Sequence, residues 1–348
     1  MNRKFKRGQR QTVKISQKAL VNTSFLSDRQ PFPLVIQPAL DQFQPVNWAQ
    51  ENCPFVQTNL LKYGAILFRN FGIESAAMFE QFARTLSPDL LDYVERAAPR
   101  HAVTPKVYTS TEFSADQYIP LHHEMSYSHN WPKILYFFCD RPPSSGGCTP
   151  IVSDRTVLEQ INPEIRKKFI HKRVMYVRNY GEGLDMPWQD AFQTDDPNVV
   201  EQYCHDIGME FEWKTHNHLR TKTIGGAIAT HPETQDTVWF NHAHMFHVSN
   251  LPVTIRNTLL AEFEPDELPR NAFYGDGEPI ESEALDHIRA VYNQAAVTFP
   301  WQQGDILMLD NFLSSHGREP FEGDRRILVA MANLCKRQEM QLIKLKDI

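Results

Sequence analysis

Several features that mark specialised classes of protein are scarce in this chain. Its five cysteines are scattered over 348 residues without a CxxC pair, which argues against a disulfide framework or a zinc knuckle and fits a reducing compartment. The longest apolar runs, such as 134–139, are far shorter than the roughly 20 residues of a membrane span, and no opening segment has the apolar core of a signal peptide. With 36 basic against 42 acidic residues, the chain lacks the positive excess typical of nucleic-acid-binding proteins. We therefore expect a cytoplasmic protein with neither a membrane nor a nucleic acid as partner.

The basic residues that are present gather at the start of the chain. Seven of them precede the first acidic residue, Asp28: Arg3, Lys4, Lys6, Arg7, Arg10, Lys14 and Lys18. We interpret residues 1–29 as a basic, flexible tail, with docking onto an acidic partner as the alternative. Residues 30–348 are expected to form a single domain.

Hydrophobic spacing predicts that an N-terminal α/β segment leads into a β-rich body. A helix over 48–62 should end at Gly64, a buried strand should follow over 65–69, and Ser75 should cap a second helix. Further helices are predicted over 162–169 and 281–293. Short strands are predicted over 106–109, 133–139, 148–152, 174–178, 227–230, 237–241, 296–299, 304–311 and 326–331. This pattern favours an α+β fold whose core is a double-stranded β-helix, or jelly roll, with flanking helices, although another β-sandwich would also fit.

One short stretch, LHHEMSY at 121–127, is suited to metal binding. If it is a strand, His122 and Glu124 lie two positions apart and point to the same face. Two histidines and one carboxylate form the facial triad that holds non-haem Fe(II), so the pair needs one more histidine. His316 follows an apolar strand near a glycine and is the candidate. The denser cluster HAHMFH at 242–247 is a rival metal site, but no nearby Cys, Asp or Glu completes it.

The motifs together resemble those of the iron- and 2-oxoglutarate-dependent dioxygenases of the TauD/TfdA family. The resemblance runs from about residue 30 to 335 and is nearest to the SyrP-like branch associated with nonribosomal peptide biosynthesis. It rests on the segments LHHEMSY (121–127), GGCTP (146–150), GDILMLDN (304–311), HGR (316–318), RRIL (325–328), YTSTE (108–112), WFN (239–241) and YGDG (274–277). The long stretch between the metal-ligand motifs would then contain an insertion at about 185–225.

The resemblance implies a set of site residues. His122, Glu124 and His316 would be the iron ligands, while Arg326 and Thr149 would hold the distal carboxylate of 2-oxoglutarate. Arg325 is the alternative to Arg326, since neighbouring residues of a strand face opposite ways. Beyond the metal ligands no catalytic residue is implied. The candidate contacts to substrate or cosubstrate are Arg318, His129, Trp131 and Asn241.

The expected function is an oxidoreductase that uses Fe(II), 2-oxoglutarate and O2 to hydroxylate an aliphatic carbon of an amino acid or amino-acid-derived substrate in specialised metabolism. Succinate and CO2 would be the coproducts. The substrate is expected to be free or tethered to an acidic peptidyl carrier protein. Alternatives within the class are a free amino acid hydroxylase, a desaturase or a cyclase, and outside it a non-catalytic metal-binding jelly roll. Glu124 argues against halogenation, because halogenating relatives have a small residue there.

Overall fold

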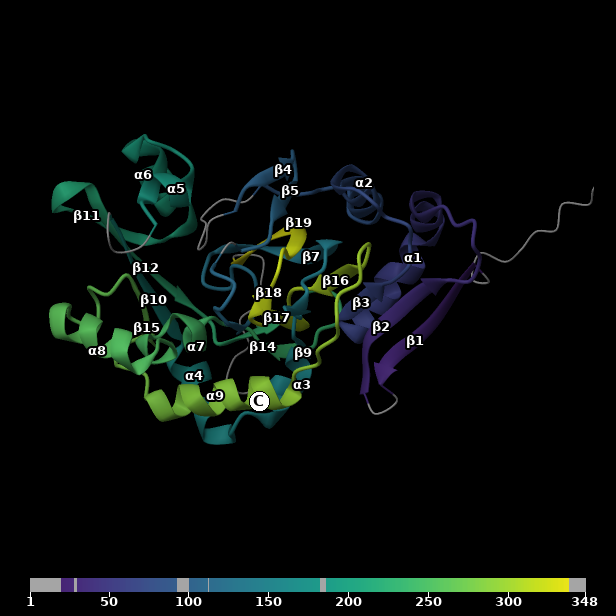
Figure 1. Cartoon of the computed structure of the whole chain (residues 1–348). Helices are drawn as coiled ribbons and strands as arrows, with labels where there is room; N and C mark the ends of the chain where they lie inside the picture. The colour runs from purple at the N-terminus through teal and green to yellow at the C-terminus, as the bar shows by residue number, and fades with distance from the viewer. Residues whose placement is uncertain (1–19, 28–29, 93–99, 112, 182–185, 338–348) are drawn as a thin grey trace, which may run out of the picture.

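The structure is a computed structural model that describes residues 20–27, 30–92, 100–111, 113–181 and 186–337. An eight-stranded sheet in the order β1-β2-β3-β16-β7-β19-β5-β4 forms its largest layer (Figure 1). All its neighbouring strands are antiparallel except β2 and β3. The bounds are β1 (Val21–Ser27), β2 (Gln30–Pro38), β3 (Ala65–Phe68), β4 (Ala102–Thr104), β5 (Val107–Thr109), β7 (Asn130–Arg141), β16 (Ile306–Asp310) and β19 (Arg326–Lys336).

Both faces of this sheet are buried, which explains the nearly continuous apolar runs of its central strands. In β16, Leu307 and Leu309 belong to the inner core, whereas Ile306 and Met308 face the opposite way. Helices α1 (Pro45–Tyr63) and α2 (Ala76–Leu86) cover that outer face. Gly64 ends α1 in the left-handed conformation and the Ser75 hydroxyl caps α2, as the sequence predicted.

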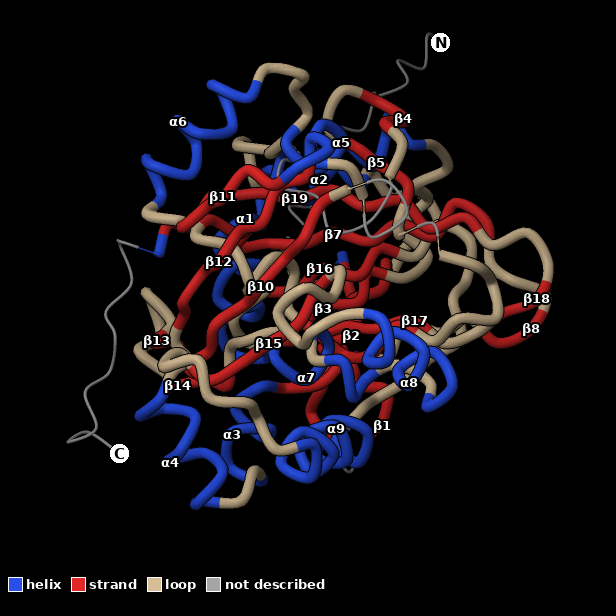
Figure 2. The backbone as a smooth tube through the Cα atoms, turned by 90° about the vertical axis from the view of Figure 1, so that its left-hand side faces the viewer, coloured by secondary structure: helices blue, strands red, loops and turns tan. Residues whose placement is uncertain are grey.

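The inner face packs on smaller sheets that complete the β-rich body (Figure 2). A three-stranded sheet has the order β6-β17-β9, with β6 (Ile119–His122), β17 (Ser314–Arg318) and β9 (Ile151–Ser153). A four-stranded sheet has the order β11-β12-β10-β15, with β11 (Glu210–Lys214), β12 (His218–Gly225), β10 (Val174–Tyr180) and β15 (Arg270–Tyr274). Two short pairs join β13 (Ile228–Thr230) to β14 (Thr237–Trp239), and β18 (Phe321–Glu322) to β8 (Ser145–Gly146).

The remaining helices lie around these sheets. They are α3 (Asp154–Gln160), α4 (Pro163–Lys172), α5 (Trp188–Phe192), α6 (Pro197–Ile207), α7 (Ala243–Phe246), α8 (Val253–Glu262) and α9 (Ser282–Ala295), with single 3-10 turns η2 (Thr215–Asn217) and η3 (Val248–Asn250). None of the helices in the described ranges is long and apolar enough to cross a membrane.

Three expectations about the elements are corrected by the structure. The predicted tail, residues 1–29, contains strand β1, which pairs with β2; residues 1–19 lie outside the described part. The predicted insertion at 185–225 is not merely a cover, because its strand β12 pairs with β10 and its helices α5 and α6 pack on a small core of their own. The segment 296–299 makes only one isolated bridge, Val297 with Ile151, instead of a strand.

Candidate metal centre

Two histidines face each other across neighbouring strands of the three-stranded sheet. His122 is the last residue of β6, His316 lies in β17, and the two are direct partners in the antiparallel ladder. Their ring centroids are 4.5 Å apart. His122 Nδ1 lies 2.8 Å from the carbonyl oxygen of Pro120. Because a carbonyl can only accept, Nδ1 carries the proton, which leaves the Nε2 lone pair for a metal.

The Glu124 side chain also lies beside the two histidines, but it is not on the strand that the sequence suggested. Strand β6 ends at His122, and Glu124 lies in the following turn, in which Met125 adopts a positive φ of 59°. The Asn311 side chain fixes this turn, since its Oδ1 accepts from the Glu124 N–H and its Nδ2 donates to the Glu124 carbonyl, both at 2.9 Å. The Arg100 guanidinium donates to Glu124 Oε2 at 2.8 Å, and both side chains are almost fully buried. The strand-spacing argument was therefore wrong, because Glu124 lies beyond the end of the strand.

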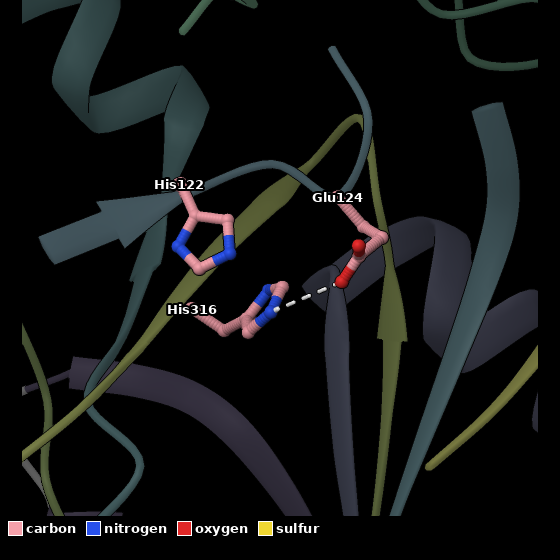
Figure 3. Close-up of side chains that lie close together, drawn as sticks. All are labelled: His122, Glu124 and His316. Atoms are coloured by element: carbon pink, nitrogen blue, oxygen red, sulfur yellow. Dashed lines mark ion pairs between the residues drawn. The ribbon is translucent and has the colours of Figure 1, made fainter. Parts of the chain in front are cut away.

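The three side chains converge (Figure 3). His122, Glu124 and His316 each offer one ligand atom, and these atoms lie within 4.8 Å of one another. His316 Nε2 is 4.0 Å from Glu124 Oε2. No other cluster of this kind, with three or more His, Cys, Asp or Glu, occurs in the described residues. The rival cluster at 242–247 therefore forms no second metal site in that part of the chain.

Burial favours the neutral, metal-binding form of both histidines. It lowers the pKa of His122, against an opposing effect of Glu124, and it lowers the pKa of His316 well below the usual value, with further lowering from His122 and Arg100. Neutral imidazoles and one carboxylate are borderline ligands that suit Fe(II). The donor set thus fits non-haem iron held on one face.

A small cavity adjoins the two histidines. Thr149 and Arg325 lie in its wall, and Arg325 donates to the Gly147 carbonyl at 2.9 Å and to Thr149 Oγ1 at 3.3 Å. The indole N–H of Trp301 also donates to Thr149 Oγ1, at 3.1 Å. Burial, reinforced by the nearby Arg318, lowers the pKa of Arg325 to about 10, so its guanidinium stays charged at neutral pH. The cavity thus presents a cation and a hydroxyl, the pair expected to grip a carboxylate.

Arg326 does not enter this cavity. Its side chain is 42% exposed and its Nη1 lies 3.2 Å from Asp140 Oδ2, on the other face of the strand. Arg325 and Ile327, which are two positions apart, both lie in the cavity wall, as alternation along an extended chain would place them. The prediction that Arg326 faces the cosubstrate is corrected in favour of Arg325, because alternation along the chain could not by itself say which arginine points inward.

The structure places the four candidate contacts to substrate or cosubstrate in different surroundings. Arg318 lines the cavity, but four backbone carbonyls hold its guanidinium, those of Thr111, Phe113, Ser114 and Gln117, at 2.6–3.3 Å. It therefore fixes a segment that contributes Thr111 to the cavity wall.

The three other candidates lie outside both cavities that adjoin the metal centre. Trp131 packs between Phe240 and Phe312, and Asn241 binds backbone groups of Ala227 and Ala243. The backbone carbonyl of His129 accepts from the Arg337 N–H. These three residues have packing or backbone contacts away from the two cavities, and their role as substrate contacts stays a prediction.

A second small cavity adjoins the first, since Arg100, Thr111, Ile119 and His122 line both, and Glu124 also lies in its wall. The sequence did not single out its other polar lining residues individually: Arg100, Thr111, Tyr127, His242 and Arg270. His242 was noticed only within the histidine cluster; its ring lies edge-on to that of His122 at 5.4 Å, and its Nδ1 is 3.1 Å from Ser126 Oγ. Arg100 belongs to no motif, so nothing in the sequence pointed to it.

Comparison with known proteins places the chain in a family. Residues 28–332 match the family described as Taurine catabolism dioxygenase TauD, TfdA family. The chain belongs to this family, and it is an oxygenase that uses Fe(II), 2-oxoglutarate and O2.

Among curated relatives, the chain is similar to the dapdiamide synthesis protein DdaC of Enterobacter agglomerans, with 42% identity over 272 residues, covering 78% of this chain and 83% of that one. It is also similar to a clavaminate synthase-like protein of Arabidopsis thaliana, with 32% identity over 336 residues, covering 89% and 95%. The crystal structure of PvcB from Pseudomonas aeruginosa shares the fold, with a TM-score of 0.56 at 16% identity, covering 95% of this chain and 99% of that one. A second PvcB structure, described as an Fe, alpha-ketoglutarate-dependent oxygenase from an isonitrile synthetic pathway, has a TM-score of 0.55 at 17% identity, covering 92% and 96%. The shared fold supports the predicted jelly-roll core.

Proposed function

We propose that His122, Glu124 and His316 hold the Fe(II) of this oxygenase. The observation that carries the proposal is the convergence of their ligand atoms within 4.8 Å, beside a cavity with a buried arginine. Bound iron with 2-oxoglutarate supplies the oxidising chemistry, which releases succinate and CO2. The task of the protein is to position the reactants and exclude water. Asn311 contributes by holding the backbone of Glu124, and Arg100 by donating to its carboxylate.

Arg325 and Thr149 are proposed to bind the distal carboxylate of 2-oxoglutarate. A planar guanidinium and a short hydroxyl donor match a carboxylate, and Trp301 orients the hydroxyl because its N–H donates to the Thr149 oxygen. The cavity that they line also contains His122 and His316. A cosubstrate bound there would therefore reach the metal with its other end.

The substrate is proposed to occupy the second cavity and to extend outward from it. This cavity shares Phe113, Ile119, Met245, Phe246 and Arg270 with a larger groove that runs toward helix α8. Most of the side chains that line the groove are apolar, and many of them belong to loops. A free amino acid would leave the groove unused, whereas an elongated substrate would fill both spaces.

We therefore favour hydroxylation of an aliphatic carbon of an amino-acid-derived substrate carried by an acidic peptidyl carrier protein, in specialised metabolism. The groove supports an extended substrate, and the relatives named for dapdiamide synthesis and for an isonitrile pathway support the metabolic setting. The alternatives are a free amino acid hydroxylase, a desaturase or a cyclase of the same class. A non-catalytic metal-binding protein would have no use for Arg325 and Thr149.

The test is a panel of free and carrier-loaded amino acids incubated with Fe(II), 2-oxoglutarate and O2, and analysed by mass spectrometry. A gain of one oxygen on carrier-bound substrates, and not on the free amino acids, is expected. A loss of two hydrogens would indicate desaturation or cyclisation, and turnover of free amino acids alone would contradict carrier binding. Removal of residues 1–20 is expected to slow only the carrier-bound reaction, because the basic segment would attract an acidic carrier. Unchanged turnover would exclude that role of the segment.

A further inference from the structure

A buried polar cluster lies directly behind the metal centre. His123 and Ser315 are the sequence neighbours of His122 and His316, but their side chains meet Asp154 instead of the metal centre. Asp154, the first residue of α3, lies between them. Its Oδ2 is 3.1 Å from His123 Nε2, and the Ser315 hydroxyl lies 3.0 Å and 2.9 Å from its two carboxylate oxygens. All three side chains are fully buried.

The cluster links all three strands of the small sheet. Asp154 follows β9, Ser315 belongs to β17, and His123 follows β6. The backbone N–H of Asp154 also donates to the Leu313 carbonyl at 2.9 Å, and the Tyr292 hydroxyl of α9 donates to Asp154 Oδ1 at 3.2 Å. Because a carboxylate only accepts hydrogen bonds, the hydroxyl groups of Ser315 and Tyr292 donate to Asp154, and the His123 ring lies within ion-pair distance of it. This arrangement fixes both the distance and the rotation between β6 and β17.

Apolar packing alone would not define that geometry so narrowly. Hydrogen bonds are directional, whereas apolar contacts tolerate small shifts of one strand along another. A shift between β6 and β17 would separate His122 from His316, since each ligand is one residue away from a member of the cluster. Metal sites depend on such outer contacts to orient their ligands.

We propose that Asp154, with His123 and Ser315, is a positioning device that sets the separation of the two histidine ligands and thereby the affinity for Fe(II). The inference rests on the proposed function, in which His122 and His316 bind iron. Asp154 touches neither metal nor substrate, so it acts through the two strands. Tyr292 supports the carboxylate from the helix side.

The test compares Asp154→Asn with the wild-type protein in anaerobic Fe(II) titrations. The amide presents one acceptor oxygen and an NH2 donor, so it cannot accept from all three partners. We expect the dissociation constant for Fe(II) to rise by about tenfold or more, the size of effect seen for outer-shell changes at other metal sites. The visible absorption band of the Fe(II) and 2-oxoglutarate complex should shift as well, because the ligand geometry changes.

Tyr136→Phe is the matched control. It removes another buried hydrogen bond, the 2.7 Å contact with Ser87, on the outer side of the large sheet. This variant should lose thermal stability but bind Fe(II) as the wild type does. If Asp154→Asn also loses only stability and keeps the wild-type dissociation constant, the positioning role is refuted.

Ser315→Ala is the second variant, and it tests the proposal if Asp154→Asn fails to fold. It removes the hydroxyl but leaves the contact between His123 and Asp154, so a smaller loss of Fe(II) affinity is expected, and no loss would overturn the proposal. Failure of the proposed function would look different, because the wild-type protein itself would then not bind Fe(II).

Discussion

At the scale of single residues, the choice between two adjacent arginines decides how the cosubstrate binds. Arg325 is largely buried beside Thr149, whereas Arg326 is half-exposed beside Asp140. The Arg325→Ala substitution should raise the KM for 2-oxoglutarate by two to three orders of magnitude, on the basis of about 3–5 kcal/mol for removing one partner of a buried charge pair. The measurement is succinate formation as a function of 2-oxoglutarate concentration.

Arg326→Ala is the natural control for that experiment. It removes a guanidinium of the same kind one residue away and an ion pair that is exposed to solvent. Its KM should remain within about twofold of the wild-type value, since surface pairs contribute roughly 0–1 kcal/mol. If Arg326→Ala raised the KM for 2-oxoglutarate more than Arg325→Ala does, Arg326 would be the residue that binds the cosubstrate.

Buried histidines give the protein a predictable response to acid. Burial lowers the pKa of His244 from 6.5 to about 3, so the unfolded chain takes up a proton between these values and the folded protein does not. The free energy of unfolding should therefore fall as the pH drops from about 6.5 toward 3, at up to about 1.4 kcal/mol per pH unit from this one residue.

The comparison with His244→Gln isolates this contribution, because glutamine can still donate to the Leu121 carbonyl that His244 Nε2 contacts. Urea unfolding at several pH values measures the effect. As the pH falls, the free energy of unfolding should decline less steeply for the variant than for the wild type, and the difference in slope should correspond to one proton. Equal slopes would show that His244 does not carry the effect.

At the scale of elements, the end of α1 is tied to the start of β17. Gly64 adopts a φ of 77°, and a Cβ at this position would lie 2.7 Å from Ser314 Oγ and 3.2 Å from Leu313 Cβ. Gly208, at the end of α6, has a φ of 68° but no atom within 4 Å of such a Cβ. Both glycines end a helix in the left-handed conformation, so they differ only in their surroundings.

The Gly208→Ala substitution should lower the free energy of unfolding by about 1 kcal/mol, the cost of a left-handed alanine. Gly64→Ala should cost clearly more, because Ser314 and Leu313 must also move. Chemical denaturation of both variants measures the difference. Equal losses would show that the contact with β17 is readily relieved.

Elements with strong local signals were predicted well from the sequence. The helix ends marked by Gly64 and Ser75 were predicted correctly because capping depends on neighbouring residues. The strand predicted over 296–299 failed, because pairing depends on which partner is available and only Val297 finds one. The same dependence explains why β12, inside the predicted insertion, belongs to a sheet.

The site itself was predicted unevenly for a similar reason. The proposed metal ligands His122, Glu124 and His316 were predicted from residue types and family resemblance, and the structure brings their side chains together. The roles of Arg100 and Arg325 required tertiary contacts that no local pattern encodes. The hold of Asn311 on the Glu124 backbone is another tertiary contact of this kind.

At the scale of the whole molecule, two cavities adjoin one metal centre, and we propose one for the cosubstrate and the other for the substrate. The cavity with Arg325 and Thr149 and the cavity that continues into the groove both have His122 in their walls. Arg318 holds the segment around Thr111 and Phe113, which borders them. The proposed sites for cosubstrate and substrate are therefore neighbouring spaces that both reach the proposed iron ligands.

The central claim is that this arrangement consumes 2-oxoglutarate with iron and oxygen. The most direct measurement is succinate formation after O2 is admitted to anaerobic protein loaded with Fe(II) and 2-oxoglutarate, in the wild type and in His122→Ala and His316→Ala. We predict oxygen-dependent succinate from the wild type and a loss of at least about a hundredfold in both variants, because each removes one ligand of the proposed triad. Succinate formation by either variant at the wild-type rate would contradict the account.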